Sequence, residues 1–444
     1  MSDGPDWTFE LLQQYQDEIA RVAEHYRLDT YPNQIEVITA EQMMDAYSSV
    51  GMPIGYSHWS YGKKFIQTEQ NYKRGQMGLA YEIVINSNPC IAYLMEENTL
   101  PMQALVMAHA CYGHNSFFKG NYLFKTWTDA SSIIDYLLFA KNYIARCEEK
   151  HGIDEVENLI DSCHALMNYG VDRYKRPQQI SLFEEQKRQQ EREDYLQSQV
   201  NELWRTIPSH QQETKKHERH FPSEPQENIL YFIEKNAPLL ESWQREIIRI
   251  VRKISQYFYP QKQTQVMNEG WATFWHYTIL NHLYDEDKQW FPEYAGSNWL
   301  DTLHFAMENF KDESFISQFL SPKLIRDFKL FTIIDHEKDP NLQVGAIHDE
   351  SGYHAVRTAL SAQYNLSNHE PNIQIYDVDI RGDRSLTLRY VPHQDIPLAK
   401  SHHEVLKHLY RLWGFKVKLE QESTSGELNI LGQCPSDDSR HTTE

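Results

Sequence analysis

The amino-acid sequence predicts a mainly α-helical protein with a small α+β module near its C-terminal end. Apolar residues recur at three- and four-residue spacings in two long segments, 239–259 and 267–286, as expected for helices with a buried face. Residues 373–380 and 385–391 instead alternate apolar with polar side chains around an Arg-Gly-Asp turn, which indicates two strands. The change in periodicity predicts a separate α+β unit on a helical body.

The N-terminal half is predicted to begin with an amphipathic helix at residues 7–28. A region rich in Pro, Gly and Tyr follows at 28–62 and is expected to be a structured loop with a short helix at 41–47. Two short apolar runs, 81–85 and 90–95, flank Asn-Ser-Asn-Pro and predict a β-hairpin.

The remaining elements are mostly helices. They are predicted at residues 100–110, 130–150, 155–169, 227–235, 299–310, 351–364 and 402–413, with a strand at 415–420. Gly414 is the expected stop of the 402–413 helix. Pro260 is expected to end the 239–259 helix, and the short link to the next helix predicts an antiparallel pair.

These elements predict five regions along the chain. They are a helical domain with a β-hairpin at 1–182, a charged linker at 183–226, a helical core continuation at 227–327, the α+β module at 328–435 and a disordered tail at 436–444. The linker is predicted because charged residues, Gln and His dominate it and bury little apolar area.

Composition excludes several classes of function. The 444-residue chain carries a formal net charge of −20, and a field of that sign repels nucleic acid and anionic lipid. No apolar run approaches the roughly 18 residues of a membrane span. The first residues lack the basic and apolar regions of a secretory signal, so a cytoplasmic location is expected, with all five cysteines reduced.

The segment 267–286, MNEGWATFWHYTILNHLYDE, carries ionisable groups on a strongly apolar helix. Glu269 and His276 are seven residues apart and fall almost on the same helical face. A carboxylate and an imidazole in an apolar setting are costly unless they are paired or bind a metal. This helix is therefore the first candidate for a functional site.

A second candidate is the pair His109 and His114, which flank Ala-Cys-Tyr-Gly. Histidine ligands on one helix usually lie four apart, whereas a spacing of five places these two about 140° apart on an ideal α-helix. A π-bulge would bring both to one face. Alternatively, Gly113 ends the helix and His114 projects from a loop.

The stretch Asn-Glu-Gly-Trp-Ala at 268–272 resembles the helix that supplies the glutamate ligand in gluzincin-type metallopeptidases. The resemblance implies a gluzincin-like helical core in which His109, His114 and Glu269 bind zinc, with iron as the alternative for a two-histidine, one-carboxylate set. One feature departs from that pattern, because Ala110 and Cys111 occupy the region where such enzymes carry their general base. No catalytic residue is therefore assigned.

The alternative is that His109, His114, Glu269 and His276 form a buried hydrogen-bonded network without metal. Additional candidates are His276, His164 and Asp172, the last two favoured for core or ion-pair roles, and Cys111, which apolar neighbours should leave inert.

Long runs of the chain resemble the SpoVR-like family, named after stage V sporulation protein R, and its proteobacterial branch in particular. The runs that carry the resemblance include DTYPNQIEVITAEQMMDAYSSVGMP, MAHACYGHNSFFKGNYLF, NYGVDRYKRP and QTQVMNEGWATFWHY. The family usually carries an extra segment, with a His-x-His pair, where this chain passes directly from Glu286 to Asp287.

The resemblance implies a role in starvation and stress, and in cortex formation in spore formers. It also implies two partners, a PrkA-type AAA+ serine protein kinase and a YeaH/YhbH-type protein with a von Willebrand A-like domain. Two functions stay open: a regulatory or assembly factor on a metallohydrolase-like core, and an active zinc-dependent peptidase or amidase.

Overall fold

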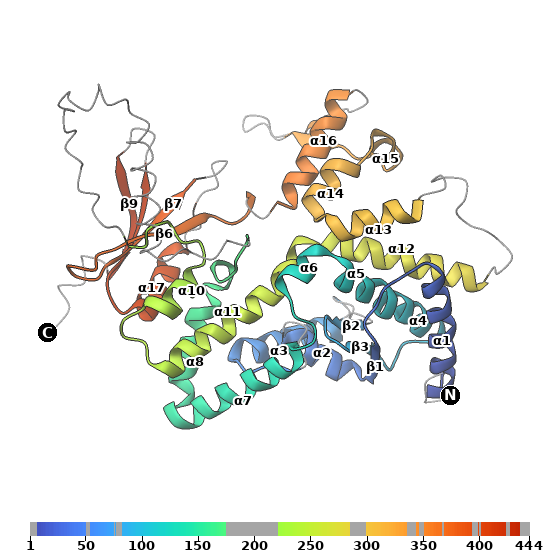
Figure 1. The fold of residues 1–444 in the computed structure, drawn as a ribbon, viewed down its shortest axis with the longest axis horizontal. Coiled ribbons are helices and arrows are strands. Elements are labelled where there is room, and N and C mark those ends of the chain that lie inside the picture. The colour runs from blue at the N-terminus through green and yellow to red at the C-terminus, as the bar shows by residue number, and fades with distance from the viewer. Residues whose placement is uncertain are drawn as a thin grey trace, which may run out of the picture.

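A computed structural model of the chain shows a mainly helical body with a small four-stranded sheet at one end (Figure 1). It describes residues 7–49, 54–74, 76, 82–174, 221–284, 299–334, 343–345, 350–365, 368–392, 398, 401–422 and 427–435. The predicted disordered tail at 436–444 and nearly all of the predicted linker at 183–226 lie outside these residues. The mainly α fold class with a C-terminal α+β module is confirmed.

The elements of the first half are α1 (Phe9–His25), β1 (Asn33–Ile38), α2 (Ala40–Ser48), α3 (Trp59–Lys73), β2 (Glu82–Ile85), β3 (Cys90–Met95), α4 (Leu100–Met107), η1 (Ala108–His114), α5 (Asn115–Gly120), α6 (Tyr122–Trp127), α7 (Ile133–His151), α8 (Ile153–His164) and η2 (Met167–Tyr169). The elements of the second half are α10 (Ile229–Asn236), α11 (Ser242–Gln263), α12 (Gln265–Tyr284), α13 (Trp299–Asn309), α14 (Asp312–Phe319), α15 (Pro322–Asp327), β4 (Thr332–Ile334), β5 (Gln343–Gly345), α16 (Glu350–Gln363), β6 (Asn372–Val378), β7 (Leu386–Val391), α17 (His402–Trp413), β8 (Val417–Glu422) and β9 (Leu428–Cys434).

The sheet β1-β3-β2 separates two hydrophobic cores. The predicted hairpin is confirmed, because β2 and β3 pair antiparallel, with Val84 opposite Ala92. The central strand β3 is buried along its whole length. Its alternate side chains enter different cores: Ile91 packs toward α7, α8 and α11, whereas Leu94 packs toward α1, η1 and α12.

The short helix predicted at 41–47 is present as α2, but the rest of the prediction for residues 28–62 was wrong. The region 28–62 is not a loop with one helix, because β1 pairs parallel with β3 and α3 begins at Trp59. A parallel partner so distant in sequence leaves no local signal such as a hairpin turn.

The prediction that the two long helices form an antiparallel pair is also wrong. Pro260 does not end α11, which continues to Gln263, and only Thr264 separates it from α12. The two helices follow one another along the molecule (Figure 1), α11 packing on α8 and α10 and α12 packing on η1. Pro260 stands in the last turn of α11, and its carbonyl accepts a hydrogen bond from the Thr264 hydroxyl.

The C-terminal sheet has the order β6-β7-β8-β9, with β7 and β8 parallel and α17 as the crossover between them. Gly414 caps α17 with a φ of 86°, as the sequence predicted. Leu388 and Leu409 of this unit share a core with Ile160 of α8 and Ile248 of α11. The sheet is therefore packed directly on the helical body.

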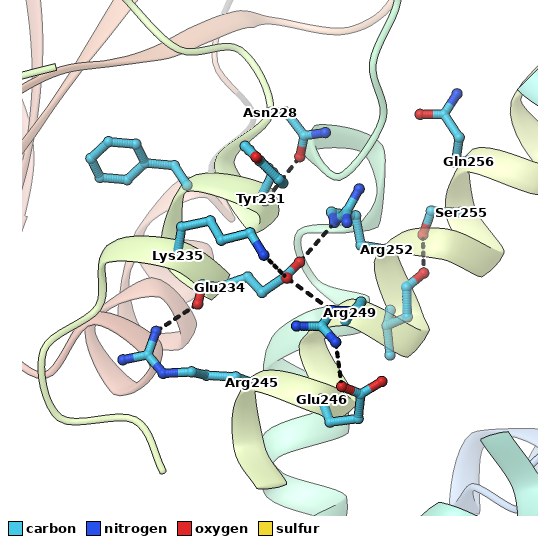
Figure 2. Close-up of polar contacts among 12 residues, drawn as sticks. Asn228, Tyr231, Glu234, Lys235, Arg245, Glu246, Arg249, Arg252, Ser255 and Gln256 are labelled. Carbon is cyan, nitrogen blue, oxygen red and sulfur yellow. Dashed lines mark hydrogen bonds and ion pairs between the residues drawn. The ribbon is translucent and has the colours of Figure 1, made fainter. Parts of the chain in front are cut away.

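A buried carboxylate joins α10 to α11. Figure 2 shows Lys235, Arg249 and Arg252 converging on Glu234, whose side chain is 1% exposed. Arg245 donates to the carbonyls of Glu234 and Ala237, which close the end of α10. The cluster fixes one helix against the other.

Within the described residues, none of the helices combines the length and the apolarity that crossing a bilayer requires.

Candidate metal centre

The segment that carries both histidines is a π-helix. Residues of η1 span His109 and His114, and hydrogen bonds in this helix type join residues five apart. The five-residue spacing therefore places both imidazoles on one face, as the first alternative from the sequence predicted. Their ring centroids lie 4.6 Å apart, and both residues are buried.

The helix α12 lies directly against η1. Its first turn is held by Asp312 at the start of α14, whose carboxylate accepts hydrogen bonds from the backbone N–H groups of Val266 and Met267 at 2.9 and 2.8 Å. Gly113 permits the close approach of η1, since a Cβ there would lie 2.5 Å from Cα of Ala272. The two segments pack side by side and His109 faces Glu269, as both the zinc set and the buried network require.

Four donor groups converge between η1, α12 and β2. Nε2 of His109 lies 3.5 Å from Oε1 of Glu82 and 3.6 Å from Oε2 of Glu269. Nε2 of His114 lies 3.9 Å from the same Glu269 oxygen. Donors bound to one tetrahedral zinc ion at about 2.0–2.1 Å are separated by about 3.3 Å, so these spacings are close to those of a shared ion.

The Nδ1 atoms of both histidines contact other polar side chains. Nδ1 of His114 lies 2.9 Å from Oδ1 of Asn268, an acceptor, so Nδ1 carries the proton and the Nε2 lone pair faces Glu269. Nδ1 of His109 lies 2.9 Å from Nδ1 of His276. A lone pair that faces a carboxylate is repelled unless a cation or a water molecule that donates to both lies between them. Contacts of this kind at Nδ1 are typical of metal-binding histidines.

The protonation states agree with this geometry. Burial and the neighbouring His109 ring lower the pKa of His114 to about 4, although Glu269 and the hydrogen bond to Asn268 act in the opposite direction. The His114 imidazole is therefore neutral at pH 7. Burial and the Glu269 carboxylate raise the pKa of Glu82 to about 7, against the opposing influence of His109. The His109 imidazole is the largest influence on Glu269 and lowers its pKa.

Two of the additional candidates, His276 and Cys111, lie beside the donors, and the other two lie elsewhere. His276 contacts His109 and so lies behind the donors. Cys111 is buried on η1, and burial raises the pKa of its thiol well above the ordinary value, in agreement with the expectation that it is inert. His164 instead bonds the hydroxyl of Tyr56 at 2.7 Å, and Asp172 accepts from the amide of Asn228 at 3.0 Å.

Sequence reasoning missed Glu82 and Asn268. Glu82 stands opposite Leu94 in the β2–β3 ladder, so its side chain projects to the same side of the sheet as Leu94, toward η1. Together with His109 and His114 it forms a group whose ligand atoms lie within 4.8 Å of one another. The available signal was a glutamate inside the apolar run Tyr-Glu-Ile-Val-Ile.

Glu269 also borders a cavity. The cavity has a volume of about 420 Å³, within the range of small-molecule sites, and Asn268 and Glu269 form part of its wall. Phe258 and Tyr259 of α11 supply apolar lining, and Lys262 supplies a cation. The side chain of Glu269 is 60% exposed, so the donor set is reachable from outside the core.

The contact at Gly113 gives a matched pair of substitutions. In Gly113→Ala the new methyl would meet the backbone of Ala272, so we expect a loss of about 1–3 kcal/mol in the free energy of unfolding. In Gly270→Ala on α12 the methyl meets nothing within 4 Å, and we expect a gain of about 0.5–1 kcal/mol. Urea unfolding of both variants measures the difference, and equal stabilities would contradict the close packing of η1 on α12.

Comparison with known families gives two matches that together span most of the chain. A family described as "SpoVR like protein" matches residues 6–284 and 284–369, and a "SpoVR-like C-terminal domain" matches residues 371–424. The first match is broken at residue 284, two residues before the position where the sequence indicated an absent family segment. Both candidate histidines and Glu269 lie inside its first part.

A curated relative agrees with these matches. The YcgB protein of Escherichia coli strain K12 is 65% identical over 491 aligned positions, which cover 98% of this chain and 96% of the relative. The alignment is longer than the 444 residues of this chain, so the relative has residues with no counterpart here. No solved structure matches.

Proposed function

Because the chain belongs to the SpoVR-like family and brings His109, His114, Glu82 and Glu269 together beside a cavity, we propose that it is a metal-dependent hydrolase. One observation carries the proposal: the unprotonated Nε2 of His114 and the carboxylate of Glu269 face each other at 3.9 Å with no proton between them. A divalent cation would accept a lone pair from each of these groups, and the spacing of His109, His114 and Glu269 suits such an ion.

His109, His114 and Glu269 would hold the ion, with zinc as the first choice and iron as the alternative. A bound divalent ion polarises a carbonyl group and makes water more acidic. Glu82 lies 3.5 Å from His109 on the adjoining strand, so its carboxylate is placed to accept a proton from water at the centre. It would thus replace the glutamate that is absent beside His109. The cavity bordered by Glu269 would hold a peptide or another amide.

A second candidate function follows from the same four side chains. If Glu82 binds the ion as a fourth ligand, a tetrahedral site is closed, and closed sites are structural. The centre would then hold β2, η1 and α12 together in a regulatory or assembly factor. Its partners would be the PrkA-type serine kinase and the von Willebrand A-like protein that the family resemblance implies.

The test begins with metal analysis of the full chain purified without a histidine tag. We expect about one zinc or iron per chain, and we expect a chelator to lower the melting temperature. Hydrolysis of labelled casein and of peptide p-nitroanilides should be lost with the chelator and return with added metal.

The variant Glu82→Gln separates the two functions. As a general base, Glu82 is needed for hydrolysis but not for metal binding, so the variant keeps its ion and loses activity. As a structural ligand, Glu82 is needed for binding, so the variant loses metal and thermal stability, and neither protein hydrolyses the substrates. Wild-type protein without stoichiometric metal and without any response to chelator would contradict both.

A further inference from the structure

A second cluster of ionisable side chains lies at the start of α3, apart from the donors described above. Oγ of Ser60 lies 2.7 Å from Nδ1 of His58, and Nε2 of the same ring lies 3.2 Å from Oδ1 of Asp161 on α8. The three side chains thus form a line from hydroxyl to imidazole to carboxylate. This order of groups is the one found in hydrolases with a serine nucleophile, but the ring nitrogens are exchanged, since in those enzymes Nε2 faces the hydroxyl and Nδ1 the carboxylate.

The hydrogen bonds define the tautomer of His58. Its Nδ1 is 3.4 Å from the backbone N–H of Ser60, which donates, so Nδ1 is an acceptor and also receives the Ser60 hydroxyl proton. Nε2 consequently carries the hydrogen and faces Asp161. The two atoms are at ion-pair distance, although the angle falls short of a hydrogen bond. Catalytic contacts commonly tighten only when a substrate binds.

Neighbouring groups hold the ring and its carboxylate in place. The side chain of His58 is 1% exposed, and its ring packs edge-on against His164 at a centroid distance of 4.7 Å. The indole N–H of Trp59 donates to the same Oδ1 of Asp161 at 3.0 Å. Burial lowers the pKa of His58, opposed by Asp161 and Glu157, which leaves a neutral imidazole able to accept a proton.

Capping of α3 does not account for this arrangement. The cap requires only that Nδ1 of His58 accept the backbone N–H of Ser60. It requires neither a serine hydroxyl on the same nitrogen nor a carboxylate behind the ring. Ser60 is only partly buried, so a molecule in solution can reach this residue.

We propose that Ser60 is a nucleophile for acyl transfer, with His58 as its base and Asp161 as the positioning residue. The substrate class is an acyl ester or thioester, whose acyl chain would lie on the half-exposed ring of Trp59. Negative charge on the acyl oxygen would develop near the N-terminus of α3, where the helix dipole favours it.

The reaction has two balanced halves. Oγ of Ser60 bonds to the acyl carbon, Nδ1 of His58 takes the hydroxyl proton, and the ring returns that proton to the alcohol or thiol as its bond to the acyl carbon breaks. Water then bonds to the acyl carbon and gives a proton to His58. The bond to Ser60 breaks, Oγ regains a proton, and a carboxylic acid leaves.

The test is covalent labelling of the full chain with a fluorophosphonate probe, followed by peptide mass spectrometry. We expect the probe on Ser60 and expect no label there in Ser60→Ala. Ser57, which is exposed three residues upstream, gives the matched control, because Ser57→Ala should label as wild type. Asp161→Asn should slow labelling by at least about 100-fold, and Asp161→Glu should restore part of the rate.

A purely structural role predicts a different pattern. Melting temperatures and far-ultraviolet circular dichroism identify variants that fail to fold, and the rate of labelling against pH should change in folded Asp161→Asn. His58 is left unchanged because it also caps α3. No reaction at Ser60 in folded wild-type protein, or labelling of Ser57 and Ser60 at equal rates, would overturn the proposal.

Discussion

Replacing Glu269 with Gln is expected to lower metal affinity by at least about a hundredfold while the fold survives. The amide keeps the shape of the side chain but removes the charge that faces the imidazoles of His109 and His114 at 3.6 and 3.9 Å. Because the side chain is 60% exposed, the substitution buries no new polar group. Titration against a competing fluorescent chelator, together with elemental analysis, measures the loss.

The variant Glu308→Gln is the matched control, since Glu308 is an exposed glutamate on α13, away from the donors. It should retain the wild-type affinity. A hydrogen-bonded network without metal predicts another result: Glu269→Gln would change the melting temperature moderately, and neither protein would contain an ion to lose. Elemental analysis of the three proteins with and without chelator decides between these outcomes.

The sequence predicted the meeting of His109 and Glu269 because each lies on an apolar helix that cannot bury it alone. The π-helix was predicted only as one of two alternatives. A local sequence does not decide whether a turn widens, and here the close contact of Gly113 with Ala272 accompanies the wider turn. Packing between distant segments therefore determined this detail.

Glu82 illustrates what the sequence could not give. It reaches the site because β2 pairs with β3 in one register, and that register places its side chain on the η1 side of the sheet. A shift of one residue would turn it to the opposite side. Likewise, β1 was missed because its parallel partner is distant in the chain, and a one-residue link could not give the direction of α12 relative to α11.

The resemblance to the SpoVR-like family is confirmed along the chain, but family membership does not identify the residues of the candidate site. The gluzincin-like likeness rested on five residues around Glu269 and implied three ligands on helices. The structure adds a carboxylate from a strand, Glu82, which has no place in that likeness. Support for a metal site therefore comes from the distances and lone pairs of these side chains, and not from the likeness.

The largest stability effect is expected at Glu234, far from the donors. Glu234→Gln should lower the free energy of unfolding by about 2–3 kcal/mol at pH 7, because it leaves the mostly buried Arg252 and the partly exposed Arg249 and Lys235 without their counter-ion. The carboxylate receives hydrogen bonds from Arg249 at 3.0 Å and Arg252 at 3.1 Å, and Lys235 lies 2.8 Å away (Figure 2). Glu246→Gln is the control: among the described residues Glu246 forms an ion pair only with Arg249, and it is 22% exposed, so its loss should cost at most about 1 kcal/mol.

The effect should depend on pH in a defined direction. Burial alone would raise the pKa of Glu234, but the hydrogen bonds of Lys235 and Arg249 and the charge of Arg252 outweigh it, so the pKa is lowered in the folded protein. A carboxylate with a lowered pKa stabilises the fold fully above its unfolded pKa of about 4.3, and the contribution disappears as pH falls through the folded value. Urea unfolding of wild type and Glu234→Gln should therefore differ most at neutral pH and converge in acid. A difference that stays constant from pH 7 to pH 3 would show that the ion pairs do not hold α10 on α11.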